Sequence, residues 1–171
     1  TGGGTEETTI VDAALMDGLT TVGLSASGAA GDTVFSGMKN FVDAEMKNGA
    51  GDLTLNYNGA QVVTGETDSQ NLTVSNLTAG TFTADGIETI NITSETAKST
   101  LTGVASDALK TVTITGDQNL TISDAIVFAA TANGSTVEGT VDASQFTGNL
   151  SVDASGSAST VSVTGGSGND T

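Results

Sequence analysis

The 171-residue sequence has no cysteine, proline, histidine, tryptophan or arginine. Without cysteine the chain forms neither a disulfide scaffold nor a thiolate metal site. Without histidine it has no Ser-His-Asp triad, no HExxH zinc site and no imidazole acid or base. Sugar sites usually need aromatic platforms, and this chain has only one tyrosine and five phenylalanines. These absences predict a protein that is not an enzyme.

Basic residues are also scarce, because four lysines stand against 20 carboxylates and give a net charge of −16. Such a chain repels nucleic acid and anionic membrane surfaces, so we exclude both as partners. Short carboxylates near glycines suit hard cations that prefer oxygen ligands, such as calcium. No apolar run approaches the ~18 residues of a membrane-spanning helix, so we expect no membrane insertion.

What the chain has instead is abundant threonine, together with 23 glycines. From residue 52 onward, short runs alternate apolar residues with Thr, Ser or Asn, which is the period of a strand with one buried face. Asn-Gly and Asp-Gly pairs between the runs are turn signals. This pattern predicts an all-β fold of stacked short strands, either a β-solenoid like a β-roll or a β-sandwich. The predicted strands are 52–57, 60–63, 71–77, 81–84, 88–93, 110–115, 119–123, 136–143, 149–154 and 160–164.

Two short units recur along the chain. The first has the form small-φ-x-x-φ-x-φ-small, where φ is apolar, and occurs at 18–25, 86–93, 108–115 and, more loosely, 37–44. The second is Asn-Leu-Thr/Ser-Val/Ile, at 71–74, 119–122 and 149–152. Units of this kind indicate stacked rungs, each of which buries the face of the next. We expect Asn and Thr at matching positions of neighbouring rungs to form hydrogen-bonded ladders.

The N-terminal segment allows a second interpretation. Val34, Met38, Phe41 and Val42 lie at helical spacing, and Lys47 suits the C-terminus of a helix. The same stretch carries the loosest copy of the first repeat unit. The sequence therefore permits at most one short helix in residues 1–50, and none after them.

We expect three segments in what we interpret as a fragment of a longer chain. Residues 1–50 form an N-terminal strand or short-helix segment, and residues 51–164 form a Thr-rich strand-repeat region. Residues 165–171 are the start of a calcium-binding nonapeptide. The last boundary depends on a motif, which is described next.

The segment 165–171, GGSGNDT, has seven residues of the nonapeptide G-G-x-G-x-D-x-U-x, in which U is a large apolar residue. Calcium takes six to eight oxygens at about 2.3–2.6 Å, and a glycine-rich turn can direct its carbonyl groups inward. We therefore expect carbonyl oxygens around Gly165, Gly166 and Gly168 and the carboxylate of Asp170 to be metal ligands. A plain glycine-rich turn is the alternative.

A degraded copy of the same nonapeptide occurs at 27–35, SGAAGDTVF. It matches the pattern at Gly28, Asp32 and Val34, but Ser27 and Ala30 replace two of the glycines. Asp32 is therefore a second candidate metal ligand.

Four stretches resemble the RTX-type surface-layer (S-layer) proteins of Gram-negative bacteria. They are GIETINIT (86–93), DALKTVTITGDQNLTI (107–122), DASQFTGNLSVDAS (142–155) and VSVTGGSGNDT (161–171). The resemblance implies type I secretion through a C-terminal signal beyond Thr171, folding outside the cell in calcium, and Ca²⁺ ions that bridge protein units. In RTX rolls a calcium ion lies between repeats on neighbouring turns, so Asp170 alone would supply half of a site.

The resemblance also implies a function and a location. We expect a structural protein on the extracellular side of the bacterial cell surface, which self-assembles into a calcium-stabilised lattice or filament. Surface polysaccharide or lipopolysaccharide is a further candidate partner.

Two alternatives stay open. One is a binding module of a large RTX adhesin, which would remain monomeric. The other is a calcium-dependent polysaccharide lyase or hydrolase, in which carboxylates such as Asp142 and Asp153 pair on adjacent rungs.

Overall fold

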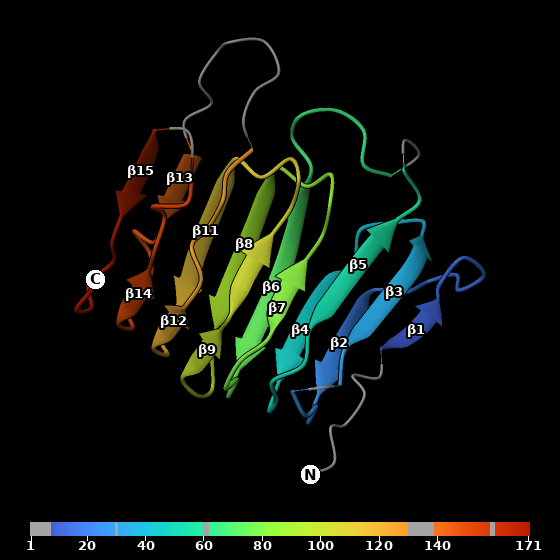
Figure 1. The fold of residues 1–171 in the computed structure, drawn as a ribbon, viewed down its shortest axis with the longest axis horizontal. Helices are drawn as coiled ribbons and strands as arrows, with labels where there is room; N and C mark the ends of the chain where they lie inside the picture. Colours follow the sequence, from blue (N-terminus) through green and yellow to red (C-terminus); the bar gives the residue numbers. More distant parts are fainter. Residues whose placement is uncertain (1–7, 30, 60–61, 130–138, 158–159) are drawn as a thin grey trace.

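The structure, a computed structural model, describes residues 8–29, 31–59, 62–129, 139–157 and 160–171. In these ranges the chain forms strands β1 to β15 and no α-helix. Neighbouring strands there pair in parallel and stack into a β-solenoid of about six turns (Figure 1). The prediction of an all-β solenoid is confirmed, and the sandwich alternative is wrong.

Seven strands form the longest sheet, which we call sheet B, with the order β15-β13-β11-β8-β6-β4-β2. Sheet A has the order β1-β3-β5-β7-β10, and sheet C has the order β14-β12-β9. The strands of sheet B are β2 (Thr21–Ser25), β4 (Asp43–Lys47), β6 (Ser69–Ser75), β8 (Thr89–Ser94), β11 (Thr111–Gly116), β13 (Gly139–Asp142) and β15 (Val161–Thr164). Those of sheet A are β1 (Thr9–Asp12), β3 (Thr33–Met38), β5 (Leu53–Tyr57), β7 (Thr81–Thr83) and β10 (Gly103–Ala105). Those of sheet C are β9 (Ser99–Leu101), β12 (Leu120–Ile122) and β14 (Leu150–Val152).

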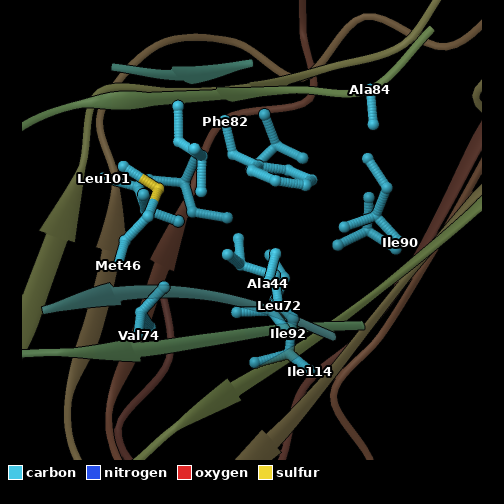
Figure 2. Packing of buried hydrophobic residues seen from close by; sticks show 14 of the residues in the cluster. Ala44, Met46, Leu72, Val74, Phe82, Ala84, Ile90, Ile92, Leu101 and Ile114 are labelled. Atoms are coloured by element: carbon cyan, nitrogen blue, oxygen red, sulfur yellow. The ribbon is translucent and has the colours of Figure 1, made fainter. Parts of the chain in front are cut away.

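A single apolar core lies between sheet B and the two shorter sheets. Met46 comes from sheet B, Phe82 from sheet A and Leu101 from sheet C, and Figure 2 shows all three pointing into the interior that Ile92 also enters. All four side chains are buried. Burial of an apolar side chain of this size stabilises the fold by about 1.5–3 kcal/mol. The alternation of apolar with polar residues along each strand supplies these inward-facing side chains.

The polar residues form hydrogen-bonded ladders from turn to turn, as the sequence predicted. Asn91 Nδ2 donates to Asn71 Oδ1 at 3.1 Å, and the hydroxyl oxygens of Thr93 and Thr115 lie 3.2 Å apart. At the corner that follows sheet B, the amide N–H of Asn149 donates to the Asn119 side chain at 3.0 Å.

Four strands of sheet B, namely β2, β4, β6 and β8, are followed within two residues by a non-glycine residue in the left-handed conformation. The residues are Ala26 (φ 57°), Asn48 (φ 55°), Asn76 (φ 53°) and Thr96 (φ 64°). Asparagine tolerates this conformation better than alanine or threonine, because its short polar side chain can hydrogen-bond locally. Here Asn76 Nδ2 donates to Asn48 Oδ1 at 3.0 Å, so two of the four turns combine a tolerant residue with a ladder contact.

The helical interpretation of the segment around Val34 to Lys47 is wrong. This stretch forms β3 and β4, which belong to different sheets. Strands from before and after residue 50 share sheets A and B, because β3 pairs with β5 and β4 pairs with β6. Within the described part of the chain there is accordingly no helix of the length and hydropathy needed to cross a bilayer.

The repeat units are correct in part. The copies at 86–93 and 108–115 are in register, since Ile92 pairs with Ile114. The copy at 18–25 is shifted, because Val22 lies in the column of Ile92 rather than that of Ile90. In the loosest copy, 37–44, the unit predicts that Phe41 faces the core. The structure instead buries Val42, one residue later, and leaves Phe41 41% exposed.

The second unit and the strand boundaries need similar corrections. Residues 119–122 and 149–152 stack in sheet C, but 71–74 lies in sheet B. The strands β9 and β10 follow Thr96 closely and were not predicted from the sequence. The predicted strand 60–63 lies partly outside the described residues, and its remaining part, 62–63, is a turn; the predicted strand 136–143 is described only from residue 139 onward.

Candidate functional site

The segment GGSGNDT follows β15 and forms a corner stacked on the preceding turn. The N–H of Ser167 donates to the Phe146 carbonyl at 3.0 Å, and the N–H of Asn169 donates to Asn149 Oδ1 at 2.9 Å. A Cβ atom at Gly168 would lie 2.1 Å from the Gly148 carbonyl oxygen, and one at Gly166 would lie 1.9 Å from that of Phe146. Close stacking of two corners therefore explains both glycines.

The Asp170 carboxylate accepts hydrogen bonds from two backbone amides. Oδ1 accepts the N–H of Leu150 at 3.0 Å, and Oδ2 accepts the N–H of Gly166 at 2.8 Å. Thr171 exchanges backbone hydrogen bonds with Leu150 and Val152, so Asp170 lies beside Leu150. One aspartate thus ties its own corner to the strand of the turn below.

The corner offers only part of a calcium site. In the described ranges, the carbonyl oxygens of Gly165, Gly166 and Gly168 accept no backbone N–H, and each carboxylate oxygen of Asp170 keeps a second lone pair. However, no group of three or more Asp or Glu side chains is placed to hold a metal among the described residues. Because calcium takes six to eight oxygens, these residues fit the ion only with further oxygens from outside the corner.

Asp32 lies in a second glycine–aspartate corner, before β3. Its Oδ1 accepts the N–H of Asp52 at 3.0 Å, and Asp52 Oδ1 accepts the N–H of Thr81 at 2.7 Å. A Cβ atom at Gly51 would lie 2.5 Å from the Gly31 carbonyl oxygen. Gly28 belongs to the same corner, where its carbonyl accepts the N–H of Gly31 at 2.9 Å.

Asp52 was missed by the sequence analysis. Its signal is the string NGAGD (48–52), which repeats the Gly-Asp pair of GD (31–32) one turn later. The nonapeptide pattern does not find it, because the spacing between the glycines differs. The hydrogen bond from the Asp52 amide to Asp32 joins two neighbouring turns, so it depends on how the turns stack and not on the motif.

The two corners do not come together. Asp32 precedes β3 near one end of the stack, and Asp170 follows β15 at the opposite end (Figure 1). The two candidate ligands therefore do not share one ion in this chain.

Asp142 and Asp153, the carboxylates of the lyase alternative, do not lie in one column. Asp142 pairs with Thr113 and Thr164 in sheet B, and Asp153 follows β14 of sheet C. Each closes a local turn, because Asp142 Oδ1 accepts the N–H of Ser144 at 2.9 Å and Asp153 Oδ1 accepts that of Ser155 at 2.8 Å. These amides lower the pKa of both carboxyl groups. Both therefore stay ionised as turn-forming acceptors.

Among the described residues, the phenol of Tyr57 is the other ionisable group with a shifted pKa. Burial raises the pKa of Tyr57, and its hydroxyl hydrogen-bonds the side chain of Gln70, which is itself buried. The phenol therefore stays neutral and serves the packing between sheets A and B.

No protein-family model, no curated protein and no solved structure matches this chain.

Proposed function

We propose that the chain is a structural protein of a bacterial surface layer, an RTX-type protein exported by type I secretion. It assembles with copies of itself into an extracellular lattice that calcium stabilises. The observation that supports this proposal best is the unbroken seven-stranded ladder of sheet B. A solenoid of this kind is a rod in which each turn contacts only its neighbours, so its shape suits a mechanical element.

The side chains support a structural role over a catalytic one. Asp32, Asp52, Asp142, Asp153 and Asp170 each accept a backbone N–H in a corner or turn. Carboxylates used in this way hold the corners of the rod. We therefore propose that the chain is not an enzyme.

Calcium enters the proposal through charge and through the C-terminal corner. With a net charge of −16, copies of the chain repel one another at low ionic strength. A cation between acidic corners removes part of that repulsion. In the corner of Gly165 to Asp170, the three glycine carbonyl oxygens accept no backbone N–H from the described residues, and a calcium ion there needs additional oxygens, which a further turn or a second copy can supply.

The test is assembly under controlled calcium. The protein is stripped with a chelator, millimolar calcium is added, and the product is imaged by negative-stain electron microscopy. We expect ordered sheets or filaments that disappear when the chelator is restored. Magnesium at the same concentration is the matched control for simple charge screening.

A monomer at every calcium concentration would contradict self-assembly. The adhesin module would then become the better proposal, because it predicts a chain that stays monomeric. Turnover of an acidic polysaccharide by the calcium-loaded protein would contradict the non-catalytic role.

A further inference from the structure

The outer face of sheet B carries a regular array of short polar side chains at its centre. On β6, β8 and β11 the inward-facing residues are apolar except for Gln70 and Ser94, and the alternate residues face outward. We call these outward residues the hydroxyl grid. It consists of Ser69, Asn71, Thr73, Thr89, Asn91, Thr93, Thr111, Thr113 and Thr115.

The grid is in register in both directions. Asn71 pairs with Asn91, and Asn91 pairs with Thr113, with no bulge across the three strands. One column continues beyond the grid, because Thr111 pairs with Thr140 and Thr140 pairs with Ser162. That column therefore carries one hydroxyl on each of five consecutive strands, from Ser69 to Ser162.

The side chains of the grid are held in place. Asn91 is hydrogen-bonded to Asn71, and Thr93 to Thr115. Threonine is also stiff at χ1, because its Cβ is branched. Beneath the grid, Ile90, Ile92 and their neighbours in the column are fully buried and fix the backbone. Binding of a partner to this face would therefore cost little side-chain entropy.

The grid is free of charge in a strongly acidic chain. The nearest outward-facing carboxylates in sheet B are Asp43 and Glu45 on β4 and Asp142 on β13, which flank the grid on its two sides. Asp43 contacts the grid directly, because its Oδ1 accepts a hydrogen bond from Asn71 Nδ2 at 3.0 Å. An uncharged face complements an uncharged partner. The grid also has no aromatic residue, whereas protein interfaces are enriched in aromatic anchors. Both features favour a small, neutral, repeating hydrogen-bonding partner over a protein surface.

The spacing of the grid fits such a partner. Strands lie about 4.7–4.9 Å apart, and alternate residues along a strand lie about 6.6 Å apart, so the hydroxyls form a nearly rectangular net. The prism face of hexagonal ice also presents water oxygens in a rectangular net, with a short repeat close to the strand spacing and a long repeat somewhat greater than the spacing of alternate residues. We propose that the hydroxyl grid binds ice, with the threonine hydroxyls in the positions of lattice waters. This function goes beyond the lattice role and does not depend on it.

The first measurement is ice affinity of the full chain. A fluorescently labelled protein is exposed to a slowly growing ice hemisphere, and the fraction incorporated is compared with that of a labelled protein that does not bind ice. Recrystallisation of fine-grained ice is followed in parallel. We expect enrichment of the protein in ice and smaller grains than in buffer.

A matched pair of variants locates the effect. Thr113→Lys places a long charged side chain in the middle of β11, the grid strand next to β13, beside Asn91 in the register. Thr121→Lys makes the same change at the centre of sheet C, where Thr121 pairs with Thr100 and Ser151. We expect Thr113→Lys to lower incorporation several-fold and Thr121→Lys to leave it unchanged. If either lysine variant unfolds below the wild-type temperature, Thr113→Ala and Thr121→Ala replace the pair.

Three outcomes would overturn the proposal. The first is incorporation of the wild type no greater than that of the non-binding protein. The second is equal loss in the two lysine variants. The third is size-exclusion chromatography in which the wild type is a dimer and Thr113→Lys is a monomer, because the grid would then be a contact between copies. Calcium-dependent assembly is measured separately, so failure of ice binding leaves the lattice proposal standing on its own test.

Discussion

Val112 and Val163 occupy one column of sheet B, joined through Val141. Both follow a hydroxyl residue and face the same side of the sheet. Val112 is fully buried, whereas Val163 is 52% exposed. The difference is position, because β11 has neighbours on both sides and β15 pairs only with β13 in the described residues. In this solenoid, the contribution of an apolar side chain to stability therefore depends on the neighbouring turns that bury it.

The largest expected change in stability comes from truncating these two valines. Val112→Ala leaves a cavity between covered turns, and we expect it to lower the free energy of unfolding by about 2–3 kcal/mol. Val163→Ala removes the same atoms from a half-exposed side chain, and we expect a loss below about 1 kcal/mol. Urea unfolding followed by circular dichroism measures both. Equal losses would show that burial by neighbouring turns does not set the cost.

The next effect concerns the corners. At Gly51 a Cβ atom would lie 2.5 Å from the Gly31 carbonyl oxygen, whereas a Cβ atom at Gly28 meets nothing within 4 Å. Neither glycine has a positive φ, so only the stacking differs. We expect Gly51→Ala to destabilise the fold by about 1–3 kcal/mol through overpacking, and Gly28→Ala to be neutral or slightly stabilising. Thermal unfolding of the two variants compares them, and a harmless Gly51→Ala would contradict the tight stacking.

A smaller effect on stability comes from the backbone conformation of a single residue, which does not depend on a neighbouring turn. Thr96 has a φ of 64°, in the region where Asn48 and Asn76 lie in two other turns. Because a β-branched residue is strained there, we expect Thr96→Asn to raise the free energy of unfolding by about 1 kcal/mol. The reverse change, Asn48→Thr, should destabilise, both through the same strain and through loss of the hydrogen bond from Asn76. Two shifts of the same sign would argue against conformational strain as the cause.

The smallest effect is a pH dependence from the exposed turns of Asp142 and Asp153. Their amide partners lower the pKa of both carboxyl groups in the folded state. Their contribution to stability is therefore present above the unfolded pKa and is lost as the pH falls through the folded pKa. We expect the double variant Asp142→Asn, Asp153→Asn to lose less stability than the wild type between neutral pH and about pH 3. Urea midpoints at both pH values measure this, and an equal or larger acid loss in the variant would refute it.

The candidate site was predictable only where its chemistry is local. The motif GGSGNDT predicts a glycine-rich corner with one carboxylate, and the structure has such a corner. The sequence does not reveal that Asp170 bonds the amide of Leu150, because that contact joins two successive turns. Asp52 was missed for the same reason, since its amide contact with Asp32 also crosses between turns.

The sequence by itself determined the all-β class, the inward-facing residues from 52 onward and the hydrogen-bonded ladders. These follow from alternation with period 2 and from threonine and asparagine recurring at matching positions. Only the tertiary structure decided the parallel stacking, the register of each turn and the strand identity of the N-terminal segment. The length of chain between paired positions varies, being shorter from Asn71 to its partner Asn91 than from Val112 to its partner Val141. Because the loops vary in length, the register of the strands cannot be predicted from a fixed repeat in the sequence. The register is set by which apolar side chains pack on one another in neighbouring turns.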